Sequence, residues 1–79
     1  EIAPSDPYPM PTRILKEGDV GEDVKWVQWK LKNLAYLNDS IDGWFGVYTL
    51  GAVLVFQLKN GLVCDGIVGP ATRDLLAKV

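Results

Sequence analysis

The fold is decided by one five-residue pattern that occurs three times, as Glu17-Gly18-Asp19-Val20-Gly21, Asp42-Gly43-Trp44-Phe45-Gly46 and Asp65-Gly66-Ile67-Val68-Gly69. Each copy reads acid, glycine, any residue, apolar residue, glycine, and a stretch with helical periodicity follows it. The two glycines allow a tight turn that buries the apolar side chain and leads into a helix. Because one turn and one helix cannot bury an apolar face alone, three such units predict one small domain.

The composition excludes several classes of protein. The chain has 79 residues, is 48% hydrophobic and carries a net charge of −2, which fits one compact core and leaves no room for a second. Its lysines are scattered, so we expect no nucleic-acid partner. No apolar run approaches the length of a membrane span, and no signal peptide is visible.

The residues available for chemistry are few. The chain contains no histidine and a single cysteine, Cys64, so a Ser-His-Asp or Cys-His mechanism cannot be assembled and an internal disulfide cannot form. A pair of carboxylates in a glycosidase would need a substrate cleft that a core of this size does not offer. We therefore predict no catalysis, no metal site and no cofactor, and we expect Cys64 to be a small buried residue.

The chain divides into two parts by composition. Residues 1–12 contain four of the five prolines, which favour extended backbone. We therefore interpret residues 1–13 as a proline-rich linker or arm and residues 14–79 as the domain. A linker on the N-terminal side of the domain predicts that it belongs to a longer protein and follows another domain.

Apolar spacing predicts three helices, over about residues 22–34, 47–59 and from Pro70 onward. The second should end at Asn60-Gly61. The expected class is all-α, a small three-helix bundle with an internal pseudo-repeat. The inner faces are predicted to hold Val24, Val27, Leu31 and Leu34, then Thr49, Ala52, Val53 and Phe56, then Leu75, Leu76 and Val79.

The acids of the repeats have two interpretations. Asp42 and Asp65 could accept hydrogen bonds from their own turns or from a neighbouring helix start, as structural clamps. The alternative is a carboxylate that faces a ligand, and we favour the clamp because the glycines already imply constrained turns. Thr49 and Thr72 follow their turns at positions where a hydroxyl can reach back, so we expect them to be capping groups.

These residues together resemble a known family. The pattern formed by Gly18 to Gly21, both Asp-Gly turns, Gln28, Gln57 and the helical apolar positions is similar to the peptidoglycan-binding domain of type 1, from about Ile14 to Val79. The resemblance implies a non-catalytic three-helix module attached to bacterial or phage cell-wall enzymes. It also implies a secreted protein that is extracellular or bound to the cell wall.

The chain departs from the family pattern at three positions. Ala35 stands where a glycine usually precedes an aromatic residue, which puts the left-handed cap of the first helix in doubt. Trp26 and Trp29 replace polar residues on the face opposite Val24 and Val27, and such apolar surface normally marks a contact. We expect the arm, with Tyr8 and Met10, or an upstream catalytic domain to cover this pair, and sugar stacking is the alternative.

The resemblance suggests where peptidoglycan would bind. Trp44 occupies the variable position of its turn, where it is either a ligand platform or a packing residue. Tyr48 and Arg73, near the starts of the second and third helices, are candidates to contact a glycan or a peptide carboxylate. The candidate ligand-binding residues are therefore Trp44, Tyr48, Arg73, Asp42 and Asp65.

The predicted function is to target an attached cell-wall hydrolase, an amidase or a peptidase, to peptidoglycan. The alternative is a protein-interaction or pro-domain-like module that packs on its own parent enzyme through Trp26 and Trp29. The sequence leaves open whether the glycan strand or the stem peptide is recognised.

Overall fold

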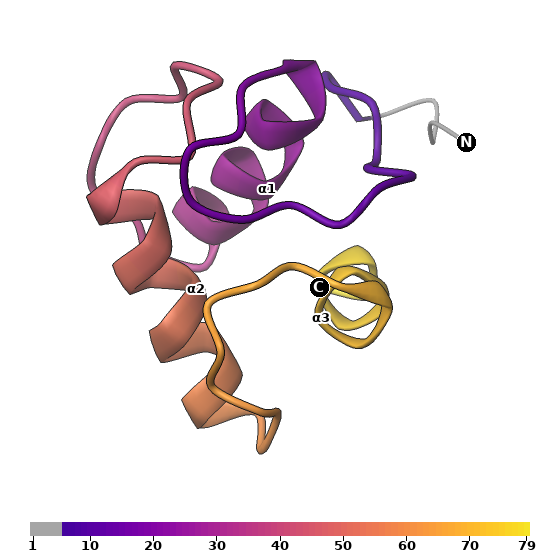
Figure 1. The fold of residues 1–79 in the computed structure, drawn as a ribbon, viewed down its shortest axis with the longest axis vertical. Coiled ribbons are helices and arrows are strands. Elements are labelled where there is room, and N and C mark those ends of the chain that lie inside the picture. Colours follow the sequence, from indigo (N-terminus) through magenta and orange to yellow (C-terminus); the bar gives the residue numbers. More distant parts are fainter. Residues whose placement is uncertain (1–5) are drawn as a thin grey trace.

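The computed structural model describes residues 6–79 and consists of three helices joined by turns and loops (Figure 1). They are α1 (Glu22–Asn33), α2 (Val47–Lys59) and α3 (Pro70–Ala77). The all-α prediction is confirmed, and each helix begins where the glycine pattern ends. None of these helices is long and apolar enough to cross a membrane, within the part of the chain that is described.

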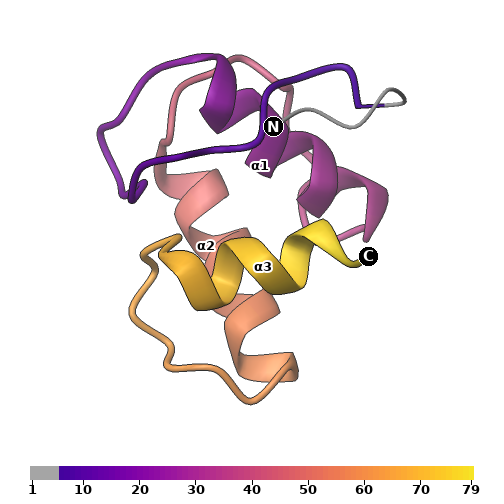
Figure 2. The ribbon, with the colours of Figure 1, turned by 90° about the vertical axis from the view of Figure 1, so that its right-hand side faces the viewer.

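Helix α1 is the centre of the domain. It packs against both α2 and α3, while the N-terminal segment runs along it (Figures 1 and 2). Because α1 is covered from several sides, it buries residues around much of its circumference. The core is made of Leu15, Val24, Trp26, Val27, Leu31, Leu37, Phe45, Ala52, Val53, Phe56, Val68 and Leu76.

The three glycine turns are joined by short backbone pairings rather than by a sheet. Leu15 pairs with Val68, and Val20 pairs with Trp44, each as an isolated antiparallel bridge. The segment from Leu15 to Val20 therefore connects the second and third turns. Gly43 has a φ of 79°, and a Cβ there would lie 3.2 Å from the backbone oxygen of Gly21, so close packing of the first two turns requires glycine.

Trp26 and Trp29, expected on the face of α1 opposite Val24 and Val27 and under a cover, lie beneath the N-terminal arm. The Trp26 side chain is 0% exposed, and its indole Nε1 donates to Oδ2 of Asp6 at 3.4 Å. Trp29 is partly buried and meets Tyr8 edge to face, with ring centroids 6.4 Å apart. The arm thus covers this side of α1. It is one of the two alternatives expected from the sequence, the other being an upstream catalytic domain.

Lys30 stabilises the same cluster. Its ammonium group lies 5.0 Å from the ring centroid of Trp29 and 5.7 Å from that of Trp26, within cation–π range. The same Nζ atom donates to the backbone oxygen of Val79 at 2.9 Å. This lysine therefore joins α1 to the residues that follow α3.

The left-handed cap of α1 forms although the residue is alanine. Ala35 has a φ of 65°, its N–H donates to Lys32 O at 3.0 Å, and Tyr36 N–H donates to Leu31 O at 2.9 Å. These two bonds are the pair that defines a Schellman motif. The predicted stop of α2 at Asn60-Gly61 is confirmed by the same motif, with Leu62 N–H donating to Gln57 O at 2.9 Å.

Two burial predictions are wrong. Cys64 is exposed, because it lies in the loop before the third turn and its sulfhydryl only reaches the backbone oxygen of Leu62, at 3.7 Å. Val79 is 53% exposed, since α3 ends at Ala77 and Val79 lies beyond it, whereas Leu76 is buried as predicted.

Candidate functional site

The second turn is held by a buried glutamine of α1. Gln28 is 1% exposed, and its Nε2 donates to Oδ1 of Asp42 at 3.0 Å, to the backbone oxygen of Trp44 at 2.9 Å and to Oγ1 of Thr49 at 3.0 Å. Its Oε1 accepts the N–H of Gly43 at 2.9 Å. The amide has two hydrogens for three acceptors, so one contact is shared. One side chain therefore links α1, the turn and the first turn of α2.

The third turn is built in the same way by Gln57 of α2. Its Nε2 donates to Oδ1 of Asp65 at 3.0 Å, to the backbone oxygen of Ile67 at 3.0 Å and to Oγ1 of Thr72 at 3.1 Å. Its Oε1 accepts the N–H of Gly66 at 2.9 Å. The internal pseudo-repeat is thus a repeat of hydrogen bonds as well as of sequence.

The two aspartates have the geometry of structural clamps. Asp42 accepts the N–H of Trp44 at 3.0 Å, and Asp65 accepts that of Ile67 at 2.9 Å. These backbone bonds, followed by the glutamine amides, lower the pKa of both carboxyl groups, since they favour the charged form. Both aspartates stay ionised at neutral pH.

The capping role expected for Thr49 and Thr72 is wrong. Their hydroxyls accept from the glutamine amides, and the N-cap residues of α2 and α3 are Gly46 and Gly69, with no side-chain cap. The first repeat also differs, because Asp19 holds its turn, accepting Lys16 N–H at 2.9 Å. In the first repeat, the turn is therefore held by Asp19 and not by Glu17, the acid that leads the pattern.

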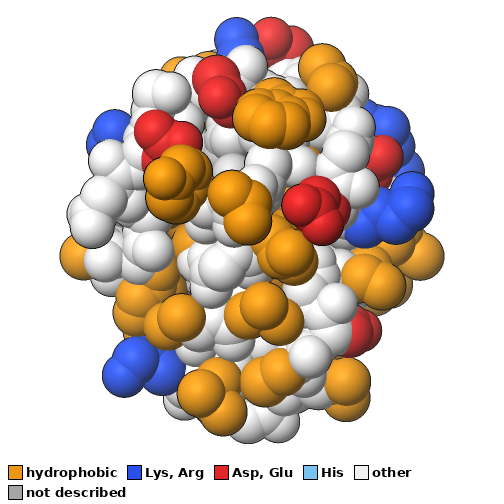
Figure 3. All heavy atoms as spheres, turned by 60° about the vertical axis from the view of Figure 1, so that its left-hand side comes forward, with side chains coloured by type: hydrophobic (Ala, Val, Ile, Leu, Met, Phe, Trp, Pro, Cys, Tyr) orange, Lys and Arg blue, Asp and Glu red, His pale blue; other side chains and the backbone are white. Residues whose placement is uncertain are grey.

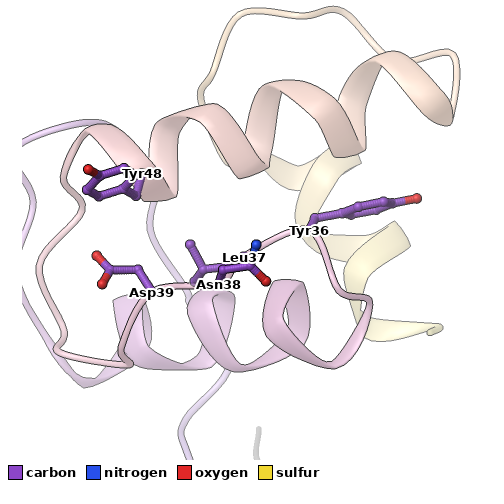
Figure 4. Close-up of a pocket in the computed structure, with 5 residues that line it drawn as sticks. All are labelled: Tyr36, Leu37, Asn38, Asp39 and Tyr48. Atoms are coloured by element: carbon purple, nitrogen blue, oxygen red, sulfur yellow. The ribbon is translucent and has the colours of Figure 1, made fainter.

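A groove lies beside the second turn, between the loop after α1 and the start of α2. One part of it, with a volume of about 420 Å³, is lined by Tyr36, Leu37, Asn38, Asp39 and Tyr48. In Figure 4, Tyr48 projects from the first turn of α2 and faces Asp39 across the opening, while Tyr36 lies at the far end. The adjoining part, of about 300 Å³, shares Asp39 and Tyr48 and adds Asp42, Trp44 and Val47.

The groove carries exposed aromatic rings on a rigid support. Trp44 is 57% exposed and Tyr48 is 71% exposed. A Cβ on Gly46 would lie 3.0 Å from the Trp44 ring, so the indole rests against the backbone at the helix start. The clamp of Gln28 fixes the backbone on both sides of this ring. Trp44 therefore offers one face of its indole to solvent in a defined position.

The surface around the groove is apolar and acidic. Figure 3 shows the side of the molecule that carries α2 and the loop before it, where hydrophobic side chains gather with acidic ones among them. Lysine and arginine side chains lie at the edges of this view. Such a surface suits a ligand that stacks on rings and donates hydrogen bonds to carboxylates.

The structure brings together only some of the candidate ligand residues. Trp44, Tyr48 and Asp42 line the groove, whereas Asp65 lines a separate hollow beside the third turn. Arg73 on α3 pairs with its neighbour Asp74 at 3.0 Å and lines neither part of the groove. Sequence reasoning missed Tyr36, Asn38 and Asp39, because a loop with no periodic pattern gave no sign that it faces α2.

The described residues, 6–79, contain no group of three or more acidic or cysteine side chains that could hold a metal ion. Every buried side-chain nitrogen and oxygen in that range has a hydrogen-bond partner. The buried amides of Gln28 and Gln57 and the hydroxyls of Thr49 and Thr72 are thus used in holding the turns.

Comparison with known proteins agrees with this architecture. Residues 20–76 match the sequence profile of the family described as "Putative peptidoglycan binding domain". The solved structure of the SleB N-terminal domain superposes with a TM-score of 0.85 at 36% identity, covering 89% of this chain and 96% of that one.

Two curated relatives extend the comparison. A spore cortex-lytic enzyme of Oceanobacillus iheyensis is 38% identical over 71 residues, which are 90% of this chain and 26% of that protein. An uncharacterized protein of Kitasatospora aureofaciens is 50% identical over 60 residues, 75% of this chain and 51% of that protein. The chain thus spans about half or less of these relatives. On its sequence, its fold and its repeated turns, the chain belongs to the family of peptidoglycan-binding domains.

Proposed function

We propose that the domain binds peptidoglycan in the groove beside its second turn and does not cleave it. The observation that carries this proposal is the pair of exposed rings, Trp44 and Tyr48, held beside the groove on a turn that Gln28 fixes. Family membership supports peptidoglycan as the ligand. The absence of histidine from the sequence supports a binding rather than a catalytic role.

We further propose that the domain holds an attached cell-wall hydrolase, an amidase or a peptidase, on its substrate outside the cell. The relative named as a spore cortex-lytic enzyme supports this reading. Tethering raises the concentration of substrate near an attached catalytic domain without changing the chemical step. The competing module, which would pack on its parent enzyme through Trp26 and Trp29, has little surface for that purpose, because Trp26 is fully buried.

Sedimentation with purified, insoluble peptidoglycan sacculi tests the proposal. The purified domain should sediment with the sacculi, and the supernatant should contain no released sugar or peptide. A Trp44→Ala variant should remain in the supernatant at concentrations where the Arg73→Ala control still sediments. Release of soluble fragments by the pure domain, or equal sedimentation of the two variants, would contradict it.

A further inference from the structure

The two glutamine-clamped turns provide an internal comparison, because one framework is used twice with different surface residues. Gln28, Asp42 and Thr49 have their equivalents in Gln57, Asp65 and Thr72, with matching hydrogen bonds. At the solvent-facing positions, Trp44 and Tyr48 of the second turn correspond to Ile67 and Ala71 of the third. The turns therefore have the same support and different surfaces.

The surface of the second turn suits a pyranose ring. Indole and phenol rings offer flat apolar faces at a small cost in conformational entropy, and the C–H face of a sugar can stack on them. Trp44 and Tyr48 are both more than half exposed, and Tyr36 lies farther along the same groove (Figure 4). The hollow at the third turn, about 500 Å³, is lined by aliphatic residues such as Ile14, Leu62 and Ile67 and by no aromatic ring.

The charges of the groove also favour a sugar. Asp39 and Asp42 are its only charged lining residues, and no lysine or arginine lines either part. Lys32 is nearby, but its Nζ donates to the backbone oxygen of Asp39, at 3.2 Å. A stem peptide carries more free carboxylates than ammonium groups, so its net charge is negative and the two aspartates, with no lining lysine or arginine, repel it. Sugar hydroxyls and N-acetyl N–H groups are neutral donors that carboxylates accept.

We infer that the groove beside the second turn recognises the neutral sugar face of the glycan strand, not the stem peptide, and that the third turn is not a second glycan site. The inference rests on the proposed function and adds the ligand class to it. Asp39 and Asn38 accept hydrogen bonds from the sugar, while Trp44 and Tyr48 stack on its ring.

Competition against binding to sacculi tests this inference with two soluble probes. The domain is first bound to sacculi, and either N-acetylglucosamine tetrasaccharide or free stem tetrapeptide is added at millimolar concentration. The tetrasaccharide should release the domain, and the tetrapeptide should not. Release by the peptide, alone or in addition to the sugar, or no release by the sugar, overturns the inference while leaving the proposed function intact. Failure to bind sacculi at all overturns the proposed function itself.

A variant copied from the chain's own third turn gives the matched control. Trp44→Ile places at the second turn the residue that the third turn already carries, so the fold should be retained, as circular dichroism can verify. Its affinity for the tetrasaccharide should fall by about tenfold or more. Ile67→Ala, at the equivalent position, should bind the sugar as the unmodified domain does. Equal affinity of Trp44→Ile and the unmodified domain would overturn the assignment of Trp44, as would loss of binding in Ile67→Ala.

Discussion

A hydrogen bond of 3.0 Å joins Nε2 of Gln28 to Oδ1 of Asp42, and it ties the middle of α1 to the turn that precedes α2. The bond serves two purposes, since the same amide fixes the backbone of Trp44. Stability of the turn and presentation of the ring therefore depend on one buried side chain.

Replacing Gln28 with methionine should lower the free energy of unfolding by about 2–3 kcal/mol, because it keeps the volume but leaves buried polar partners such as the Gly43 N–H unpaired. Urea denaturation measures this change. Gln57→Met should cost a similar amount, because its amide has the equivalent partners. A cost below about 0.5 kcal/mol for both would show that the glutamines are not needed to hold the turns.

The domain should lose stability in acid through Asp42 and Asp65, whose pKa values are lowered by hydrogen bonds in the folded state. Asp23, beside Arg13, has a lowered pKa for the same kind of reason. A group with a lowered folded pKa contributes stability above its unfolded pKa, about 4, and loses it as the pH falls through the folded value. The melting temperature should therefore decrease once the pH is lowered past about 4.

The control for this acid effect is the double variant Asp42→Asn, Asp65→Asn. At pH 7 it should melt at a lower temperature than the unmodified domain. Its melting temperature should also change less between pH 5 and pH 3. An unaltered pH profile in the double variant would mean that other carboxylates carry the effect.

Ala35→Gly should stabilise the domain by about 1 kcal/mol, because Ala35 adopts a left-handed conformation that costs little for glycine. Gly61→Ala makes the opposite change in the matching motif at the end of α2 and should destabilise by a similar amount. Thermal unfolding measures the change in stability of each variant. The same sign of shift in both would contradict the left-handed assignment at one of the two caps.

Tyr8→Ala should lower the free energy of unfolding by about 1–2 kcal/mol, because the ring packs edge to face on Trp29 and shields the core. Tyr48→Ala removes the same kind of side chain from an exposed position and should cost less than about 0.5 kcal/mol. Chemical denaturation compares them directly. Equal costs would show that the arm does not contribute to stability through Tyr8.

The helices could be predicted from sequence because their signals are local. Apolar spacing set their faces, and glycine or proline marked their ends, as at Gly61 and Pro70. The cover over Trp26 could be predicted only as a choice between the arm and an upstream domain, because the contact with Asp6 joins residues that are distant in sequence. Helical spacing placed Trp26 on the side of the helix opposite Val24 and Val27, but what covers that side is set by the tertiary structure.

The candidate site was predictable only in part, for a similar reason. Trp44 and Tyr48 stood out because they flank a glycine turn. Gln28 and Gln57 were recognised only as part of the family pattern, and their role in the turns was not predicted, although a polar residue on the inner face of a helix must find partners when buried. Asn38 and Asp39 gave no such signal, because only the packing of their loop against α2 places them in the groove.

The most direct test of the central claim uses the indole N–H signals of the three tryptophans in a ¹H–¹⁵N NMR titration. The ligand is the set of soluble disaccharide-peptide fragments that a muramidase releases from sacculi. We predict that the Trp44 signal shifts with added fragment, whereas the Trp26 signal stays in place, because that indole is fully buried and bonded to Asp6. Shifts at Trp26 or Trp29 with an unchanged Trp44 would contradict the groove beside the second turn as the binding site.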